Sequence, residues 1–111
     1  MSFKLIPTDN FLRELKKLNK KYPSLRSDLE LLSKQLLQNP SSGVEIYKNC
    51  YKIRFAIKSK SRGKSGGGRI ITWVKIEKSS IYLLSIYDKS EKENVTDQFI
   101  KAILESIEKK P

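Results

Sequence analysis

The chemistry available to this chain is concentrated in one strongly basic segment, residues 46–76. This segment carries nine of the 23 lysines and arginines and none of the 12 acids, whereas the rest of the chain has 14 cations and 12 acids. Almost all of the net charge of +11 therefore lies in one stretch, as expected for a surface that binds a polyanion such as nucleic acid. The nine cations are Lys48, Lys52, Arg54, Lys58, Lys60, Arg62, Lys64, Arg69 and Lys75.

The residue types present restrict the reactions that such a surface could catalyse. The chain has no histidine and one cysteine, Cys50, which excludes an internal disulfide and the usual serine or cysteine triad, and leaves a metal without a ligand set. We interpret Cys50 as a half-buried strand thiol and expect no cofactor. Gly63-Lys64-Ser65 lacks the glycine five residues earlier that a phosphate-binding loop requires.

Lysine, arginine and tyrosine suffice for one reaction, the cleavage of RNA by its own 2′-hydroxyl. The attacking hydroxyl needs a base, the crowded phosphorane needs positive charge, and the leaving 5′-oxygen needs an acid. A lysine beside other cations has a lowered pKa and can act as the base. Arginine stays charged and stabilises the transition state, while a tyrosine or lysine can protonate the leaving group. RNA is thus the expected ligand.

Three helices are expected to position this segment. Thr8 or Asp9 can cap the first helix, Pro23 separates it from a second that Ser24 caps, and Thr96 can cap a third near the C-terminal end. Apolar residues recur at helical spacing along all three: Phe11, Leu15 and Leu18; Leu25, Leu29, Leu32 and Leu36; and Ile100, Ile103, Leu104 and Ile107.

The middle of the chain is typical of a β-sheet because it is rich in β-branched and aromatic residues. We predict strands at residues 44–47, 50–57, 69–76 and 81–87, after a short edge strand at 3–7, and a mobile glycine-rich loop at 58–68. The expected fold class is α+β: an antiparallel sheet packed against an N-terminal helical hairpin and a C-terminal helix, in the order β-α-α-β-β-β-α. Residues 1–111 form a single domain.

Side-chain alternation divides these strands into two faces. One is a core face that the helices cover, and on the last strand alternation groups Tyr82 with Leu84 and Ile86. The other is expected to be open and to collect cations and aromatic rings. Arginine on this face can grip a phosphate with two donors, and the tryptophan can either stack on an unpaired base or pack under a loop. The open face comprises Lys52, Arg54, Lys58, Arg69, Trp73, Tyr87 and Lys89.

Over nearly its whole length the sequence resembles the RelE/HigB family of toxins from bacterial type II toxin–antitoxin systems. Residues 50–54, Cys-Tyr-Lys-Ile-Arg, are similar to the basic strand after the helical hairpin of that family; residues 62–69 are similar to the glycine-rich loop of its HigB-like branch, and residues 83–91 to its last strand. The resemblance implies a RelE-like fold and a ribosome-dependent mRNA endonuclease, or mRNA interferase, that arrests growth by inhibiting translation in the cytoplasm.

The resemblance also implies roles for individual residues. Lys52 and Arg54 match paired basic positions on the strand, Arg69 matches a phosphate-stabilising arginine after the loop, and Lys89 matches a basic position at the end of the last strand. Lys52 is the expected base or else a purely electrostatic contributor. Lys89 or Tyr87 is the expected acid, since Val95 stands where RelE-type enzymes have a tyrosine. RNA contacts are expected from Lys58, Lys60, Arg62, Lys64 and Trp73.

The expected partners are a cognate antitoxin, often a helix-turn-helix protein, together with mRNA and the ribosome. Operator DNA is expected to bind only through the antitoxin complex. No membrane contact is expected, because no apolar run approaches the ~20 residues that cross a bilayer. Two other functions remain open: a ParE-type inhibitor of DNA gyrase, which needs no RNA-cutting side chains, and an RNA-binding module without catalysis.

Overall fold

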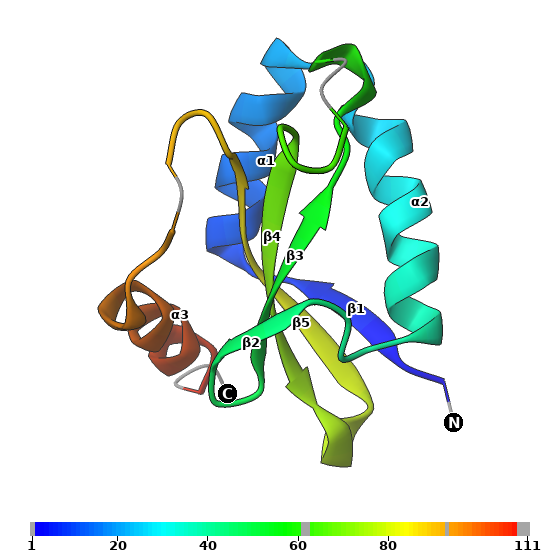
Figure 1. The fold of residues 1–111 in the computed structure, drawn as a ribbon. Helices are drawn as coiled ribbons and strands as arrows, with labels where there is room; N and C mark the ends of the chain where they lie inside the picture. Colours follow the sequence, from blue (N-terminus) through cyan, green and yellow to red (C-terminus); the bar gives the residue numbers. More distant parts are fainter. Residues whose placement is uncertain (1, 61–62, 93, 109–111) are drawn as a thin grey trace.

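The computed structural model describes residues 2–60, 63–92 and 94–108, in which three helices pack on one five-stranded sheet (Figure 1). The elements are β1 (Lys4–Pro7), α1 (Asp9–Lys21), α2 (Leu25–Gln38), β2 (Val44–Tyr47), β3 (Cys50–Phe55), β4 (Gly68–Lys75), β5 (Ser80–Asp88) and α3 (Asp97–Glu108), with short 3₁₀ helices at Lys58–Lys60 and Ile76–Lys78. The α+β class is confirmed. All four strands predicted after the helical hairpin are present, including Val44–Tyr47, so the order β-α-α-β-β-β-α is one strand short.

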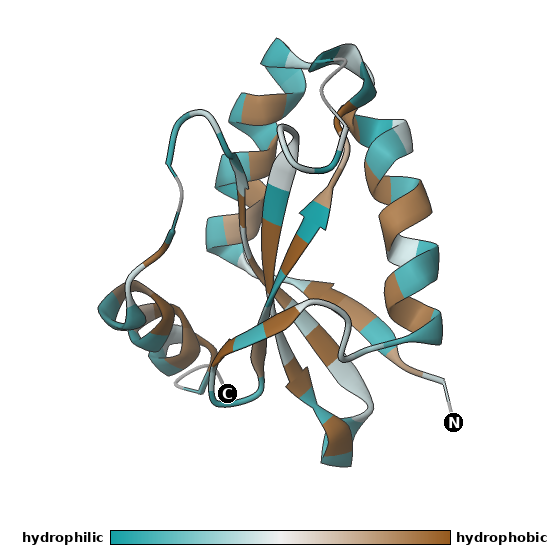
Figure 2. Cartoon of the chain, in the orientation of Figure 1, coloured by the Kyte–Doolittle hydropathy of each residue, from teal (hydrophilic) through white to brown (hydrophobic). Residues whose placement is uncertain are grey.

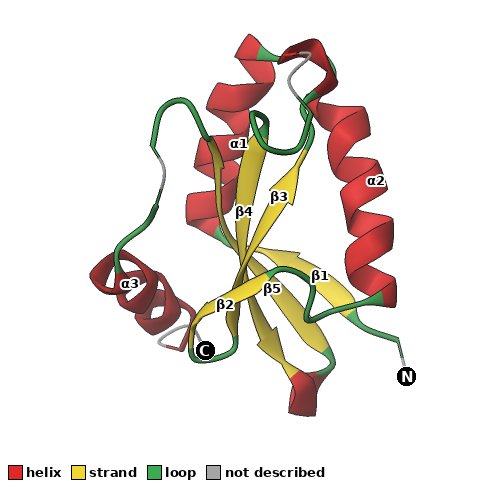
Figure 3. Ribbon diagram, viewed as in Figure 1, coloured by secondary structure: helices red, strands yellow, loops and turns green. Residues whose placement is uncertain are grey.

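The strands lie in the order β1-β5-β4-β3-β2 (Figure 3). Pairs joined by short connections are antiparallel, as predicted, and β1 is parallel to β5 at the edge of the sheet. This order places β3, β4 and β5, which carry half of the predicted site residues, side by side. No helix in the described ranges is long and apolar enough to span a bilayer.

The helical hairpin covers one face of the sheet. Thr8 is the N-cap of α1, because its hydroxyl accepts a hydrogen bond from the Phe11 N–H at 3.2 Å. The same hydroxyl donates a hydrogen bond to the Leu83 carbonyl at 2.8 Å, which ties the helix to β5. Burying each large apolar side chain contributes about 1.5–3 kcal/mol. The core between hairpin and sheet includes Phe11, Leu18, Leu25, Leu32 and Leu36 against Ile53, Phe55, Ile57, Ile70 and Ile86.

The opposite face is not the wholly open basic face that alternation predicts, because α3 packs on it. Figure 2 shows α3 set apart from the hairpin, with hydrophobic and hydrophilic residues on its different sides. Its Ile100 and Ile103 form a second core with Cys50, Ile71 and Leu84. Cys50 is therefore fully buried rather than half-buried, and burial raises the pKa of its thiol to about 12.

A bulge in β5 changes which of its side chains face the hairpin. Ile71 pairs with Ser85, but the next residue of β4, Thr72, pairs with Leu83, so Leu84 is skipped. Beyond the bulge, Tyr82 and Leu84 lie in the core under α3, whereas Ile86 lies in the core under the hairpin. The predicted grouping of Ile86 with Tyr82 and Leu84 is wrong, because strict alternation does not continue through a bulge.

The glycines before β4 permit a close crossing of two chain segments. A Cβ on Gly67 would lie 2.2 Å from the Phe55 carbonyl oxygen, and one on Gly68 would lie 2.5 Å from the Phe55 ring. The Gly67 carbonyl also accepts a hydrogen bond from the Lys89 N–H at 3.1 Å. In the described part of the loop, these glycines thus hold the start of β4 against β3 and β5.

Candidate functional site

Three of the predicted site residues form one row across three adjacent strands. Arg54 on β3 pairs with Arg69 on β4, which in turn pairs with Tyr87 on β5. Adjacent strands lie about 4.8 Å apart, so the row spans roughly 10 Å. Lys52 lies two residues before Arg54 on the same face of β3, opposite Ile71. The four side chains are therefore neighbours beside the glycine-rich loop.

Arg69 is held rigidly at the centre of this row. One of its terminal nitrogens, Nη1, donates to the carbonyls of Lys64 and Gly68 at 3.0 and 2.9 Å, and Nη2 donates to that of Ser65 at 3.2 Å. The side chain is 4% exposed, so Arg69 is not on the open surface that alternation predicts, because the loop folds over it. Three of the five N–H groups of the guanidinium are used in these hydrogen bonds.

Arg54 adds a second positive charge beside the first. It is exposed, and it lies directly across from Arg69 in the strand register. Burial, followed by the charge of Arg54, lowers the pKa of the Arg69 guanidinium. Like charges at opposed cross-strand positions repel each other, and a phosphate bound between the two guanidiniums would relieve this repulsion. Arginine also matches phosphate geometry with paired donors.

Lys52 reaches from this row toward the segment that precedes α3. Its ammonium group donates a hydrogen bond to the Asn94 side-chain oxygen at 2.8 Å. Asn94 thus places the segment after β5 next to the predicted base. Sequence reasoning missed Asn94, because its distance of 42 residues along the chain from Lys52 leaves no local signal.

Tyr87 closes the row with a phenol suited to donating a proton. The residue is 3% exposed, so it does not lie on the open surface that alternation predicts, because α3 packs on this face of the sheet. Burial raises the pKa of its hydroxyl, so the group stays protonated at neutral pH. The ammonium of Lys92 lies 5.1 Å from the centroid of its ring. Lys89, the alternative acid, is half-buried in the turn that the Gly67 carbonyl anchors.

The loop cations predicted to contact RNA differ in their surroundings. Lys58 and Lys64 are exposed, and Arg62 lies outside the described residues. Lys60 is instead turned inward: its ammonium lies 2.5 Å from a carboxylate oxygen of Asp88, and its side chain is 9% exposed. We therefore no longer expect Lys60 to contact RNA, because Asp88 neutralises its charge inside the fold.

Asp88 is the hub of a buried polar network that the sequence did not reveal. The hydroxyl of Tyr22 donates to Oδ2, while Lys60 and both the N–H and the hydroxyl of Ser90 donate to Oδ1. Burial by itself raises the pKa of this carboxyl, but these hydrogen bonds outweigh it and hold the pKa well below its usual range. The network joins the end of α1, the basic loop and the turn after β5.

Trp73 lies apart from the row. It is four residues beyond Arg69 on β4, which corresponds to about 13 Å along a strand. Its ring packs on Tyr82 with centroids 5.1 Å apart, and the Lys75 ammonium lies 5.1 Å from its centroid. Of the two interpretations of Trp73, these contacts favour packing over base stacking.

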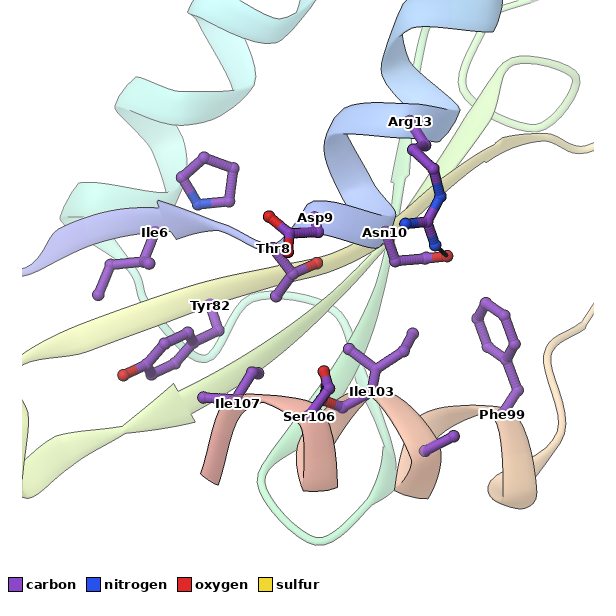
Figure 4. A pocket seen from close by; sticks show the side chains of 12 residues that line it. Ile6, Thr8, Asp9, Asn10, Arg13, Tyr82, Phe99, Ile103, Ser106 and Ile107 are labelled. Carbon is purple, nitrogen blue, oxygen red and sulfur yellow. Dashed lines mark hydrogen bonds between the residues drawn. The ribbon is translucent and has the colours of Figure 1, made fainter. Parts of the chain in front are cut away.

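A groove lies elsewhere, between α3 and the start of α1 (Figure 4). Its volume is about 450 Å³, and none of the predicted site residues lines it. Within the described ranges, no group of three or more histidine, cysteine, aspartate or glutamate side chains is arranged to hold a metal ion. The candidate site is therefore the row on the sheet, in which Arg54 is exposed and Arg69 and Tyr87 are buried, and not an enclosed pocket.

Solved structures of the Escherichia coli toxin RelE are similar to this chain. A double mutant of RelE in the free state, with two arginines replaced by alanine, has a TM-score of 0.60 and 20% identity, covering 96% of this chain and 99% of that chain. This chain has the RelE fold. A chain of the intact RelBE toxin–antitoxin complex gives a TM-score of 0.57 at 23% identity, covering 79% of this chain and 96% of that one.

The RelE fold also recurs in a complex with an antitoxin peptide. The same double mutant of E. coli RelE bound to a peptide of the antitoxin RelB has a TM-score of 0.60 and 22% identity, covering 92% of this chain and 95% of that chain. No protein-family model matches the sequence.

Proposed function

We propose that this chain is the toxin of a type II toxin–antitoxin system and that it cuts mRNA on the ribosome. The observation that carries the proposal is the row Arg54–Arg69–Tyr87 with Lys52 beside it. These side chains bring together two fixed positive charges, a protonated phenol and a primary amine on three adjacent strands. The RelE fold supports the same function.

In the proposed reaction, the scissile phosphate lies on the two guanidiniums. The 2′-hydroxyl of the preceding ribose attacks this phosphate, the bond to the leaving 5′-oxygen breaks, and a 2′,3′-cyclic phosphate forms. Negative charge grows on the phosphorane oxygens, where Arg54 and Arg69 stabilise it most. Because Arg69 is already held by three backbone carbonyls, its charge needs little rearrangement when the phosphate arrives.

The proton transfers fall to the groups on either side of the arginines. Lys52 as the neutral amine takes the proton of the 2′-hydroxyl, or as the ammonium assists its removal by its charge, and Asn94 orients its side chain. Tyr87 gives a proton to the leaving 5′-oxygen, in keeping with the raised pKa of its hydroxyl. Lys89 is the alternative donor. Lys58 and Lys64 are exposed and free to contact RNA around the cleaved bond.

We further propose a cognate antitoxin and a cytoplasmic site of action. Two of the similar RelE structures are complexes with the antitoxin RelB or with a peptide of it. By analogy, an antitoxin would bind this chain and neutralise it. Ribosome-bound mRNA is then the substrate, and operator DNA would be contacted only through the antitoxin complex.

Cleavage of mRNA on programmed ribosomes tests this function. Arg54→Ala should lower the cleavage rate by about 10²–10³, and Lys52→Ala should lower it by about 10²–10⁴ if it is the base. Lys34→Ala, an exposed change on α2, is the control and should cut like the parent. If both site variants cut at the parental rate, the row is not the active site.

Expression in bacteria separates this function from its rivals. With the proposed activity, pulse labelling shows protein synthesis stopping before DNA synthesis. If DNA synthesis stops first, a gyrase inhibitor is the better description. If the protein binds RNA but leaves ribosomal mRNA intact, it is an RNA-binding module without catalysis.

A further inference from the structure

Exposed cations also follow one edge of α1, well outside the basic segment of the sequence. Arg13, Lys17 and Lys21 recur every four residues, so they form one ridge along the helix, with a rise of about 6 Å from each to the next. All three are exposed. Lys16 and Lys20 lie on a different side of the helix, where they border a shallow hollow with Leu12.

A cleft separates this ridge from the end of β5. Its volume is about 220 Å³, and its lining includes Lys17 and Lys21 of α1, Tyr87 of β5, and Glu91 and Lys92 of the following turn. Tyr87 is also the last residue of the catalytic row proposed above. The cleft therefore begins where the row ends, so a strand lying on Arg54 and Arg69 can continue past Tyr87 into it.

The ridge is held in a fixed position relative to this row. Oε1 of Glu14 on α1 accepts hydrogen bonds from the Ser85 hydroxyl at 2.8 Å and the Ile86 N–H at 3.2 Å, both on β5. It also accepts one from the Asn10 amide at 2.9 Å. These hydrogen bonds hold α1 against β5 beside Tyr87. The distance between the cations of the ridge and the proposed site is therefore fixed.

The cations in the cleft are only weakly neutralised. Lys21 lies 3.2 Å from Glu91 with both side chains more than half exposed, and Lys92 lies 3.8 Å from Glu14. An ion pair as exposed as Lys21–Glu91 contributes little stability, so a phosphate group can replace the Glu91 carboxylate. Lys17 makes no ion pair with any residue in the described ranges. Lys17 and Lys21 are accordingly available to a polyanion, and Lys92, which lies beside the partly buried Glu14 and over the rings of Tyr87 and Phe99, adds a third positive charge at this position.

We propose that the cleft and the Arg13–Lys17–Lys21 ridge bind single-stranded RNA flanking the scissile phosphate. This inference rests on the proposed function, which places that phosphate on the row. Phosphates next to the cleaved bond lie on Lys17, Lys21 and Lys92. Figure 4 shows Arg13 on the side of α1 that faces Phe99 of α3, so the track continues along the helix beyond the cleft.

A pair of neighbouring lysines provides a matched test. Lys17→Ala and Lys16→Ala remove the same charge from exposed positions of the same helix, but only Lys17 lines the cleft. The probe is a fluorescein-labelled, fully 2′-O-methylated single-stranded RNA, which cannot be cut by 2′-hydroxyl attack. Fluorescence anisotropy over a range of salt concentrations measures the affinity, and thermal melts verify that each variant is folded.

Lys17→Ala should flatten the plot of log affinity against log salt by about 0.7, the slope lost with one phosphate contact on single-stranded nucleic acid. Lys16→Ala should leave the slope at its parental value. Glu91→Gln should raise the affinity, because it frees Lys21 from its carboxylate partner.

Arg54→Ala in the same titration separates the two proposals. If Arg54→Ala flattens the slope and Lys17→Ala does not, the track on α1 is refuted and the row on the sheet stands. The track is also refuted if Lys16→Ala and Lys17→Ala act alike, since overall charge is then sufficient. If the parent does not bind this RNA, the track falls, while cleavage on ribosomes still judges the proposed function independently.

Discussion

Replacing Asp88 with asparagine should destabilise the protein far more than a typical single substitution. The variant keeps the shape of the side chain but leaves the buried ammonium of Lys60 without its counter-charge. In the parent these two groups lie 2.5 Å apart with side chains 9% and 0% exposed. Breaking a buried pair by removing one partner costs about 3–5 kcal/mol. For a domain of this size, that lowers Tm by at least ~12 °C.

A double-mutant cycle identifies the source of this loss. Lys60→Met alone strands the carboxylate of Asp88, whereas Lys60→Met combined with Asp88→Asn removes both buried charges. The combined loss should be smaller than the sum of the single losses by at least ~1 kcal/mol, as measured by urea unfolding. Glu91→Gln, which removes an exposed ion pair in the same turn, is the control and should change stability by no more than ~0.5 kcal/mol.

The same carboxyl gives a signature in pH. Its pKa is well below the usual range in the folded protein and about 3.9 in the unfolded chain. Its contribution is therefore complete above the unfolded pKa, and it disappears as the pH falls through the folded pKa. The stability difference between parent and Asp88→Asn should be constant from pH 7 to about 5 and shrink below about 4. A difference of less than ~1 kcal/mol at pH 7, with no coupling to Lys60, would refute the network.

Three further predictions follow from burial and contacts. Arg69→Ala should abolish cleavage and also lower the free energy of unfolding by about 2 kcal/mol or more, since it removes three hydrogen bonds of a buried guanidinium. The control is Arg54→Ala at an exposed position, which should melt within a few degrees of the parent. Equal melting temperatures for the two variants would contradict this prediction. Cys50 should not react with a thiol reagent at pH 8 until the protein unfolds, because its thiol is buried and has a pKa of about 12. Rapid labelling of the native protein would argue against the core between α3 and the sheet. Gly68→Ala should destabilise the protein, because the added Cβ would collide with the Phe55 ring. The added Cβ of Gly63→Ala contacts no other atom, so this variant should lose only the ~1 kcal/mol typical of a left-handed backbone. If Gly63→Ala melts at a lower temperature than Gly68→Ala, the close contact between β3 and the start of β4 is not supported.

Local patterns were sufficient for the helices, most of the strands and part of the site. The cap at Thr8 and the spacing of Phe11 and Leu18 concern residues within a few positions of one another, and the structure confirms both. On β3, regular alternation correctly places Lys52 and Arg54 on one face and Ile53 on the other. The concentration of positive charge along the sequence also located β3 and β4, two of the three strands that carry the proposed active row.

Local patterns failed where distant segments meet. Lys60 looked like a free loop cation, but its partner Asp88 lies 28 residues further along the chain. Arg69 looked exposed because alternation describes a strand by itself and ignores the loop that folds over it. The Arg13–Lys17–Lys21 ridge lay outside the basic segment and was not connected with the site.

The α+β class, the helical hairpin and the concentration of positive charge on β3, β4 and the loop between them could be predicted from the sequence alone. These properties depend on hydrophobic periodicity and composition, which are local features of the sequence and do not depend on how distant segments pack. Which cations are exposed and which are neutralised inside the fold could be seen only once the chain is folded. That outcome depends on where β5 and α1 come to lie beside the basic loop, because burial and the distance between opposite charges are set by packing between segments far apart in the chain.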